Sequence, residues 1–155
     1  MKARIDDLDR RILSQLQRDC SLSAAELSER CGTTESTALR RWKRLIRNGV
    51  IKQQVAILDG PAVGVPLMMV VLIRMTREGS SNSVPLMRRM AEHPSVMQFF
   101  HVTGTIDFVA IIAVSTMADY EAFIAEALEV DSHLATDTNV VIRPLRLSLA
   151  MPLGK

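Results

Sequence analysis

Hydrophobic residues recur at helical spacing in three segments of the first fifty residues. The first segment opens at Asp6 or Asp7 and ends near Asp19, and its apolar positions are Leu8, Ile12, Leu13 and Leu16. Three short amphipathic helices can bury a common core if their apolar faces meet. We expect that core to consist of Leu8, Ile12, Leu16, Leu27, Leu39, Trp42, Leu45 and Ile46.

The second and third segments form a helical pair joined by a tight turn. Ser23 and Glu26 have the spacing of a capping box, so the second helix is expected over 23–31, and Gly32 permits a sharp turn after it. The third helix is expected over 35–47, with Thr34 as its N-cap and an Asn-Gly pair after its last turn. Two helices at this spacing are typical of a helix-turn-helix.

The third helix is apolar on one side and basic on the other. Its apolar residues span an arc of roughly 120°, and the opposite side carries Ser36, Arg40, Lys43, Arg44 and Arg47, extended by Thr37 and Arg41. Such a stripe is often only a solvated face, but five basic residues against the single acidic Glu35, placed after a tight turn, favour DNA binding.

The position of each residue along this helix predicts what it contacts. Recognition helices reach base edges with their N-terminal part, so base reading is expected from Ser36, Thr37, Arg40 and Arg41. Residues further along contact phosphates, which is the role expected of Lys43, Arg44 and Arg47. The hydroxyl of the capping residue, Thr34, belongs to the same predicted surface.

The second half of the chain alternates β-rich and helical segments. Strands are expected over 67–76, 96–103, 107–114 and 140–151, and helices over 84–93 and 117–130. The order β-α-β-β-α-β is ferredoxin-like. We therefore expect an α+β protein with three parts: a winged-type three-helix helix-turn-helix domain over 1–52, a linking strand and hinge over 53–64, and a ferredoxin-like domain over 65–155.

The predicted sheet has apolar residues on both of its faces. The strand sequences LMMVVLI and FVAIIAV are apolar at consecutive positions, whereas two helices can cover only one face. The other face needs a cover, and a second copy of the same sheet is the simplest one. This predicts a homodimer, which would also present two recognition helices to two half-sites of duplex DNA.

Composition and charge restrict the setting. The 155 residues contain no apolar run long enough to span a membrane and no apolar segment behind the charged N-terminus, so a cytoplasmic protein without a membrane partner is expected. Cys20 and Cys31 lack metal-ligand spacing and are expected to be reduced thiols. Residues 1–60 carry a net charge of +4 and residues 61–155 one of −2, so only the first part is expected to meet nucleic acid.

Several motifs in order resemble the Lrp/AsnC family of transcription regulators. They are LDRRILSQLQRD, AELSERCG, LRRWKRL, GVI and LDGPAVG in the first half, and VTGTIDF, ADYEAFI and LAMPL in the second. The resemblance implies a sequence-specific DNA-binding regulator that forms dimers, which can assemble into octamers. It also implies that an amino acid or a related small molecule modulates DNA binding from the second domain, without any cofactor or metal.

The resemblance further implies where the effector binds. Carried over by position, the effector pocket is built from Thr103, Gly104, Thr105, Asp107 and Phe108, with His101, Asp137 and Asn139 as additions. The turn supplies backbone N–H groups for a carboxylate, and Asp107 could accept from an α-ammonium group. Gly104 and Asp107 would equally serve to shape a β-turn.

Departures from the family pattern, and enzymes of similar architecture, leave two alternative functions. Thr105 and Ile106 stand where the family has an acidic residue and an aromatic residue, which leaves an architectural DNA binder without an effector as an alternative. The siroheme decarboxylases are similar to this family in architecture, and for an enzyme of that kind the only candidates for haem-like ligation or acid/base chemistry are His93, His101 and His133, of which His101 lies nearest the expected pocket. Glu35 and Trp42 also replace the family's usual proline and smaller apolar residue.

Overall fold

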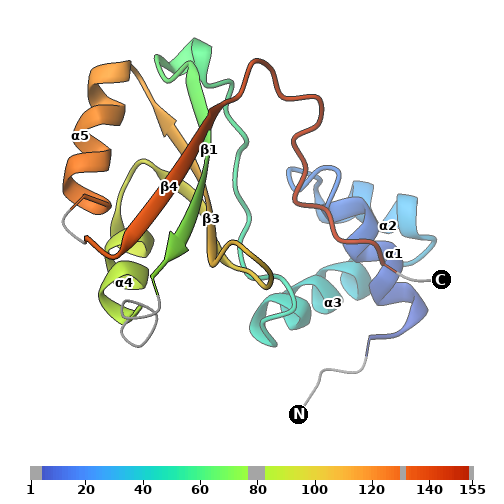
Figure 1. Ribbon diagram of the computed structural model, residues 1–155. Helices are drawn as coiled ribbons and strands as arrows, with labels where there is room; N and C mark the ends of the chain where they lie inside the picture. The colour runs from blue at the N-terminus through green and yellow to red at the C-terminus, as the bar shows by residue number, and fades with distance from the viewer. Residues whose placement is uncertain (1–4, 77–82, 130–131, 154–155) are drawn as a thin grey trace. The chain divides into compact units, whose positions relative to one another are not determined.

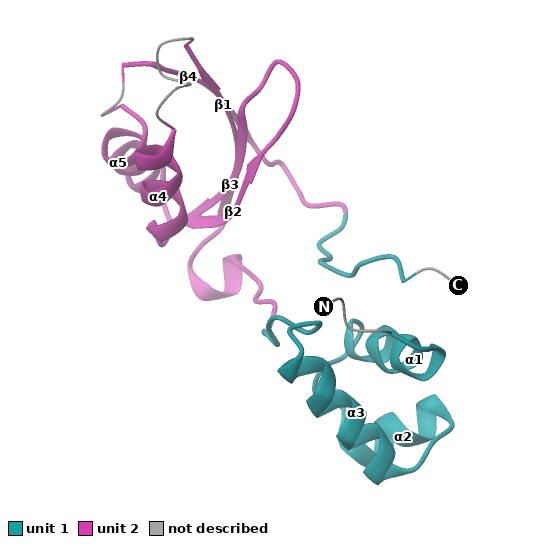
Figure 2. Ribbon diagram, turned by 90° about the horizontal axis from the view of Figure 1, so that it is seen from below, with its two compact units in different colours: residues 1–56, 146–155 teal, residues 57–145 magenta. Residues whose placement is uncertain are grey.

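The computed structural model describes residues 5–76, 83–129 and 132–153 and divides into two compact units. Unit 1 comprises residues 1–56 and 146–155, and unit 2 comprises residues 57–145 (Figure 2). Residues 146–155, which were expected from the sequence to lie in the ferredoxin-like domain, thus group with the helix-turn-helix in unit 1. Within unit 1 the amide of Gln17 donates to the backbone oxygen of Met151 over 3.1 Å and accepts from its N–H, and Leu153 packs against the helical core.

Unit 1 is built from three helices with strong local start signals. They are α1 Asp7–Leu16, α2 Ala24–Cys31 and α3 Glu35–Arg47 (Figure 1). Asp6 and Ser23 both form capping boxes, so the N-terminal N–H groups of α1 and α2 have side-chain acceptors. Gly32 lies in the left-handed region at φ 61°, where a side chain would be strained, and this ends α2 and permits the turn into α3.

The core of unit 1 confirms most of the predicted residues. Ile12, Leu16, Leu27 and Leu45 are buried, and Leu8 and Trp42 pack against them. The prediction was wrong for Leu39 and Ile46, which are 36% and 44% exposed. Both lie at one edge of the apolar arc of α3, whereas the fully buried residues Ala38 and Leu45 lie toward the opposite edge.

Unit 2 contains the predicted ferredoxin-like sheet. Its elements are the short 3-10 helix η1 Pro61–Val63, β1 Leu67–Met75, α4 Val84–Glu92, β2 Val96–His101, β3 Phe108–Val114, α5 Met117–Ala127 and β4 Leu134–Val140. The strands pair antiparallel in the order β2-β3-β1-β4. Figures 1 and 2 show α4 and α5 on the same face of this sheet, where Met69, Phe108, Met90 and Phe123 form part of the core.

Two predicted strands are not where the sequence pattern suggested. The segment 52–59 forms neither helix nor strand, so the described part of unit 1 has no β-wing. The last strand covers 134–140 and not 140–151. Apolar alternation shows that a segment could be a strand, but a strand also requires a neighbour for its backbone, and β1 pairs with Leu134–Val140.

Candidate functional site

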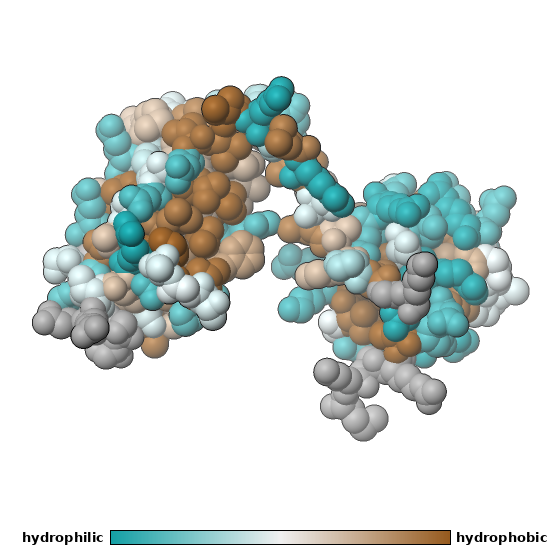
Figure 3. Space-filling view, turned by 45° about the vertical axis from the view of Figure 1, so that its right-hand side comes forward, coloured by the Kyte–Doolittle hydropathy of each residue, from teal (hydrophilic) through white to brown (hydrophobic). Residues whose placement is uncertain are grey.

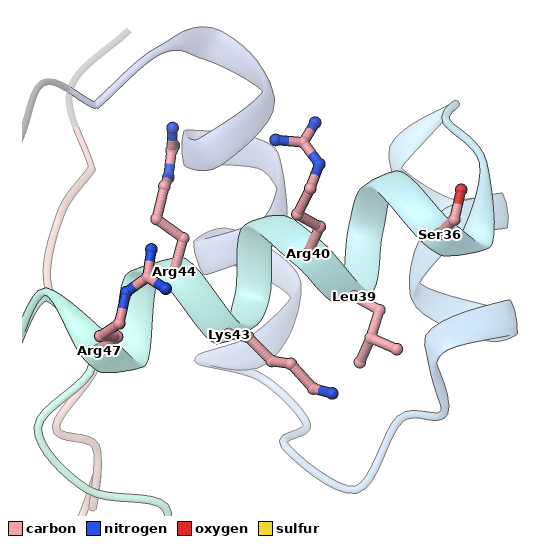
Figure 4. Close-up of a pocket in the computed structure, with 6 residues that line it drawn as sticks. All are labelled: Ser36, Leu39, Arg40, Lys43, Arg44 and Arg47. Carbon is pink, nitrogen blue, oxygen red and sulfur yellow. The ribbon is translucent and has the colours of Figure 1, made fainter.

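The exposed face of α3 carries a line of polar and basic side chains. Ser36, Arg40, Lys43, Arg44 and Arg47 line one open hollow on this face together with Leu39 (Figure 4). Their spacing of three and four residues places them on one side of the helix, as predicted. Because Ser36, Arg40, Lys43 and Arg47 are exposed, the surface is free to meet a polyanion.

The start of α3 is fixed by threonine hydroxyls. Thr34 is the N-cap, and its side chain accepts from the backbone N–H of Thr37 over 3.4 Å. The Thr34 hydroxyl also lies 2.9 Å from that of Thr37 and 3.3 Å from that of Ser36. These contacts hold the first turn of α3 and occupy part of the hydrogen-bonding capacity of Thr34 and Thr37. Ser36 remains the exposed hydroxyl on the basic face.

The structure places two of the predicted DNA contacts against α1. Asp9 is fully buried, and its carboxylate lies 3.1 Å from Nη1 of Arg41 and 2.5 Å from Nη2 of Arg44. Arg41 also pairs with Asp6, and its side chain is only 19% exposed. The guanidinium of Arg41, which was expected from the sequence to read a base edge, is thus held by two carboxylates of its own domain.

The ion pairs of this cluster shift the pKa of the Asp6 carboxylate. The hydrogen bond from Arg41 lowers the pKa of Asp6 from 3.8 to about 2, helped by the backbone N–H of Asp9. The same contacts with Asp6 and Asp9 raise the pKa of Arg41. The cluster ties α1 to the middle of α3 and therefore fixes how the basic face is presented.

Sequence reasoning missed this cluster, although a signal for it was present. On a helical projection Arg41 lies about 40° from Leu45, at the edge of the apolar arc, whereas Arg40 lies farther from it. Asp9 in turn lies three residues before Ile12, on the buried side of α1. A basic residue beside one apolar arc and an acidic residue within another predict an ion pair between helices.

The turn that should hold the effector is fastened to the sheet by Asp107. Its carboxylate accepts from the N–H of Met75 over 2.7 Å, its N–H donates to the oxygen of Ile73 over 3.0 Å, and its own oxygen accepts from Val102 over 2.9 Å. Gly104 has a φ of 116°, which a residue with a side chain rarely adopts. The turn-shaping role of both residues is therefore visible in the structure, and Asp107 is already engaged.

The other predicted effector residues surround this turn in two environments. Thr103, Thr105 and His101 are exposed, and the His101 ring stacks on Phe108 with centroids 4.7 Å apart. Phe108 itself is only 1% exposed because it belongs to the core between sheet and helices. It supports His101 from below and has almost no surface of its own to offer a ligand.

Asp137 and Asn139 lie on β4, two strands from β3. Asp137 pairs in register with Leu72, which pairs with Val109, and Asn139 occupies the corresponding place beside Val70. Asp137 forms an ion pair with Arg74 over 2.8 Å. The structure thus gathers residues 101–108 at one turn, while the two β4 residues belong to the sheet face that α4 and α5 leave open.

The part of this open sheet face that β1 and β3 form is apolar. Val70, Leu72, Val109 and Ile111 alternate with the buried residues of β1 and β3 and are partly exposed. Figure 3 shows hydrophobic side chains gathered in a band on the unit that contains the sheet. The prediction that the second face of the sheet carries apolar residues is therefore confirmed.

Within the described ranges 5–76, 83–129 and 132–153, no group of three or more His, Cys, Asp or Glu side chains could hold a metal ion, and no helix could cross a membrane. The three histidines have separate surroundings. His93 meets the edge of Phe123 at 4.8 Å, His133 lies 3.2 Å from the hydroxyl of Thr76, and His101 stacks on Phe108. Cys31 is buried, which raises the pKa of its thiol, and Cys20 is exposed.

Comparison with known proteins agrees with both units. Residues 5–46 match the AsnC-type helix-turn-helix domain, and residues 68–149 match the Lrp/AsnC ligand binding domain. The chain is 31% identical over 121 residues to a glutamate uptake regulatory protein of Zymomonas mobilis, which covers 78% of this chain and 74% of that protein. It is 32% identical over 119 residues to the DNA-binding transcriptional activator DecR of Escherichia coli, covering 77% of this chain and 78% of DecR.

Among solved structures, an AsnC family transcriptional regulator from Agrobacterium tumefaciens has the same fold. It superposes with a TM-score of 0.82 at 27% identity and covers 95% of this chain and 96% of that one. The two family matches follow the order of the two units, with the helix-turn-helix first and the ligand binding domain second. The chain belongs to the Lrp/AsnC family and is a DNA-binding transcriptional regulator, not an enzyme.

Proposed function

We propose that this regulator reads a specific duplex sequence through Ser36 and Arg40, while Lys43 and Arg47 hold phosphates. The observation that carries the proposal is the exposed basic line on α3 (Figure 4). Arg40 lies in the N-terminal half of the helix and is exposed, and an arginine fork can bond the O6 and N7 atoms of guanine. Lys43 and Arg47 follow one and two turns later, where the helix leaves the floor of the groove.

Because of their ion pairs, we assign Arg41 and Arg44 roles on this helix that differ from those expected from the sequence. Arg41 acts inside the domain, because Asp6 and Asp9 hold it there. Arg44 is 33% exposed and paired with Asp9, so it adds positive field to the phosphate-binding side without being a free contact. Thr34 and Thr37 support the first turn. We further propose a cytoplasmic location, because operator binding requires access to DNA.

Paired substitutions test the base and phosphate roles. Operators enriched from random duplexes by wild-type protein are compared with scrambled duplexes in mobility shifts. Arg40→Ala should weaken operator binding by about 1–3 kcal/mol and relax one base position, while Lys43→Ala should weaken all duplexes alike. An equal loss on both duplexes for Arg40→Ala would remove it as a base reader.

An amino acid or a close analogue is the proposed effector, bound at the turn 103–107 with His101 beside it. The match of residues 68–149 to a ligand binding domain supports this, as does the similarity to a regulator of glutamate uptake. The exposed Thr103, Thr105 and His101 are the side chains free to contact a ligand, whereas Asp107 is bonded to Met75. Asp137 and Asn139 would take part only if the ligand extends over the open sheet face.

A thermal-shift panel of the amino acids tests the effector proposal. A ligand that binds only the folded protein raises its midpoint in proportion to the logarithm of ligand concentration. We expect one amino acid or a few related ones to do so, and Thr103→Val to reduce the shift. If no amino acid moves the midpoint at millimolar concentration, the alternative of an architectural DNA binder without an effector is favoured.

Self-association completes the proposed function. The open sheet face offers partly exposed apolar residues from β1 and β3, and a second copy of the same face is the simplest cover for them. A dimer would present two α3 helices to two half-sites, and dimers of this kind could assemble into an octamer.

A further inference from the structure

Leu39 is a large apolar side chain at the edge of the basic surface. It is 36% exposed and lines the same hollow as Ser36, Arg40 and Lys43. Figure 4 shows it leaving α3 on the same side as Lys43, one turn away. The pattern of apolar residues assigned it to the core, but the core is closed by Ala38 and Leu45 instead.

The chemistry of the major groove gives such a residue a specific contact. Arginine, serine and lysine can bond the polar edges of bases, but none of them matches the one apolar group that the groove presents, the C5-methyl of thymine. Packing Leu39 against this methyl removes two apolar surfaces from water, which is favourable without any directional bond. A cytosine or purine at the same place would leave the isobutyl group against polar edges.

We propose that Leu39 is a specificity residue that reads a thymine through its 5-methyl group; this rests on the proposed function of α3 as the base-reading helix. Leu39 occupies the second turn of α3, in the N-terminal half that reaches base edges. Ser36 and Lys43, at i−3 and i+4, flank it. The thymine it reads therefore lies next to the base pair that Arg40 contacts.

Ile46 provides a matched comparison on the same helix. It follows Leu39 by seven residues, so it lies within about 20° of it around the axis, and it is 44% exposed. Its place in the last turn of α3 puts it beyond the base-reading part. If exposed apolar surface alone mattered, both residues would contribute alike, whereas groove reading requires only Leu39.

The test replaces single thymines of the enriched operator with deoxyuridine, which lacks only the methyl group. Binding of wild-type protein, Leu39→Ala, Leu39→Met and Ile46→Ala is measured by fluorescence anisotropy. Loss of one buried methyl should weaken wild-type binding about fourfold at one thymine in each half-site. Leu39→Ala should bind the two operators equally, and Leu39→Met and Ile46→Ala should keep the difference.

Each outcome bears on a definite statement. If wild-type protein binds every deoxyuridine operator as tightly as the parent, or if Leu39→Ala keeps the thymine preference, Leu39 does not read the methyl. If Leu39 had a purely structural role, Leu39→Ala would weaken binding to the parent and deoxyuridine operators by the same factor, and that result also overturns the inference. If the selection enriches no sequence at all, the proposed function of α3 fails, and this is recognised before any deoxyuridine is used.

Discussion

Asp9 is the residue that most directly fixes the position of α3 against α1. Its fully buried carboxylate bonds two arginines of α3 from its place in α1. A buried charge is tolerated only when its partners are in place. Here both partners are arginines of α3, the helix proposed to contact DNA. The basic face of α3 is thus held in place by a buried acidic residue that lies outside the surface proposed to contact DNA.

Removing this charge should loosen the helical unit. We expect Asp9→Asn to lower the free energy of unfolding by about 1.5–3 kcal/mol, because the bonds to two guanidinium groups lose their ionic partner. Urea denaturation followed by circular dichroism measures it. Asp7→Asn is the control, since Asp7 is exposed in the same turn. Equal stability of the two variants would show that the cluster does not hold α3.

The second carboxylate of the cluster predicts a pH dependence. Arg41 holds the pKa of Asp6 at about 2, below its ordinary value of 3.8. The ionised form is therefore favoured by folding, so its contribution is complete above about pH 4 and is lost as the pH falls through about 2.

Asp6→Asn isolates this contribution, because asparagine is also a good N-cap and only the charge is removed. The stability difference between wild type and Asp6→Asn should be constant from pH 7 to pH 5 and should shrink between pH 4 and pH 2. Urea titrations at fixed pH provide the values. A difference that stays unchanged down to pH 2 would contradict the lowered pKa.

At the scale of elements, Asp107 decides how the turn 103–107 is held between β2 and β3. Its carboxylate accepts from Met75 of β1, so the turn is bound to a strand that is not its neighbour in sequence. Asp107→Ala leaves that partly buried N–H without its acceptor and should cost about 1–3 kcal/mol of stability. Thr105→Ala in the same turn should leave the unfolding midpoint unchanged, because Thr105 is exposed.

The effector proposal can be separated from this structural role. If Asp107→Ala is as stable as wild type, the carboxylate is not needed for the turn and a ligand-binding role for it regains weight. If the variant is destabilised while ligand-dependent thermal shifts survive, Asp107 acts on the turn alone. Both quantities come from thermal unfolding with and without the amino acid identified in the panel.

The elements differ in how far sequence alone predicts them. Helix starts follow from residues three apart, so the capping box at Ser23 could be predicted and is present. The position of β4 could not be, because Leu134–Val140 is mostly polar and becomes a strand through its pairing with β1. Likewise, the position of Arg41 beside the apolar arc indicates a partner on another helix but does not identify that partner as Asp9, 32 residues away.

Leu39 illustrates the same limit at the site itself. A helical projection shows which side of α3 is apolar. How much of that side is buried depends on how α1 and α2 pack against α3. The two residues at one edge of the arc, Leu39 and Ile46, are exposed although both are apolar. The line of Ser36, Arg40, Lys43 and Arg47, by contrast, follows from periodicity alone and was predicted in full.

At the scale of the whole molecule, the open sheet face is the surface expected to join two copies. Ile111 lies at its centre, in register with Val70 and Gln98. Ile111→Glu should convert a dimer into a monomer, because a glutamate there would be buried without a partner. Sedimentation equilibrium measures the mass, and Met117→Glu, on an exposed site in α5, is the control. An unchanged mass for Ile111→Glu would place the interface elsewhere.

The central claim is that α3 reads sequence and does not merely bind charge. Anisotropy titrations of wild-type protein with the enriched operator and with a scrambled duplex, repeated from low to physiological salt, test it most directly. Both affinities should fall with salt as counterions are released, while the operator stays at least about a thousandfold tighter throughout. Equal affinity for the two duplexes at every salt concentration would contradict sequence reading and leave only an architectural DNA binder.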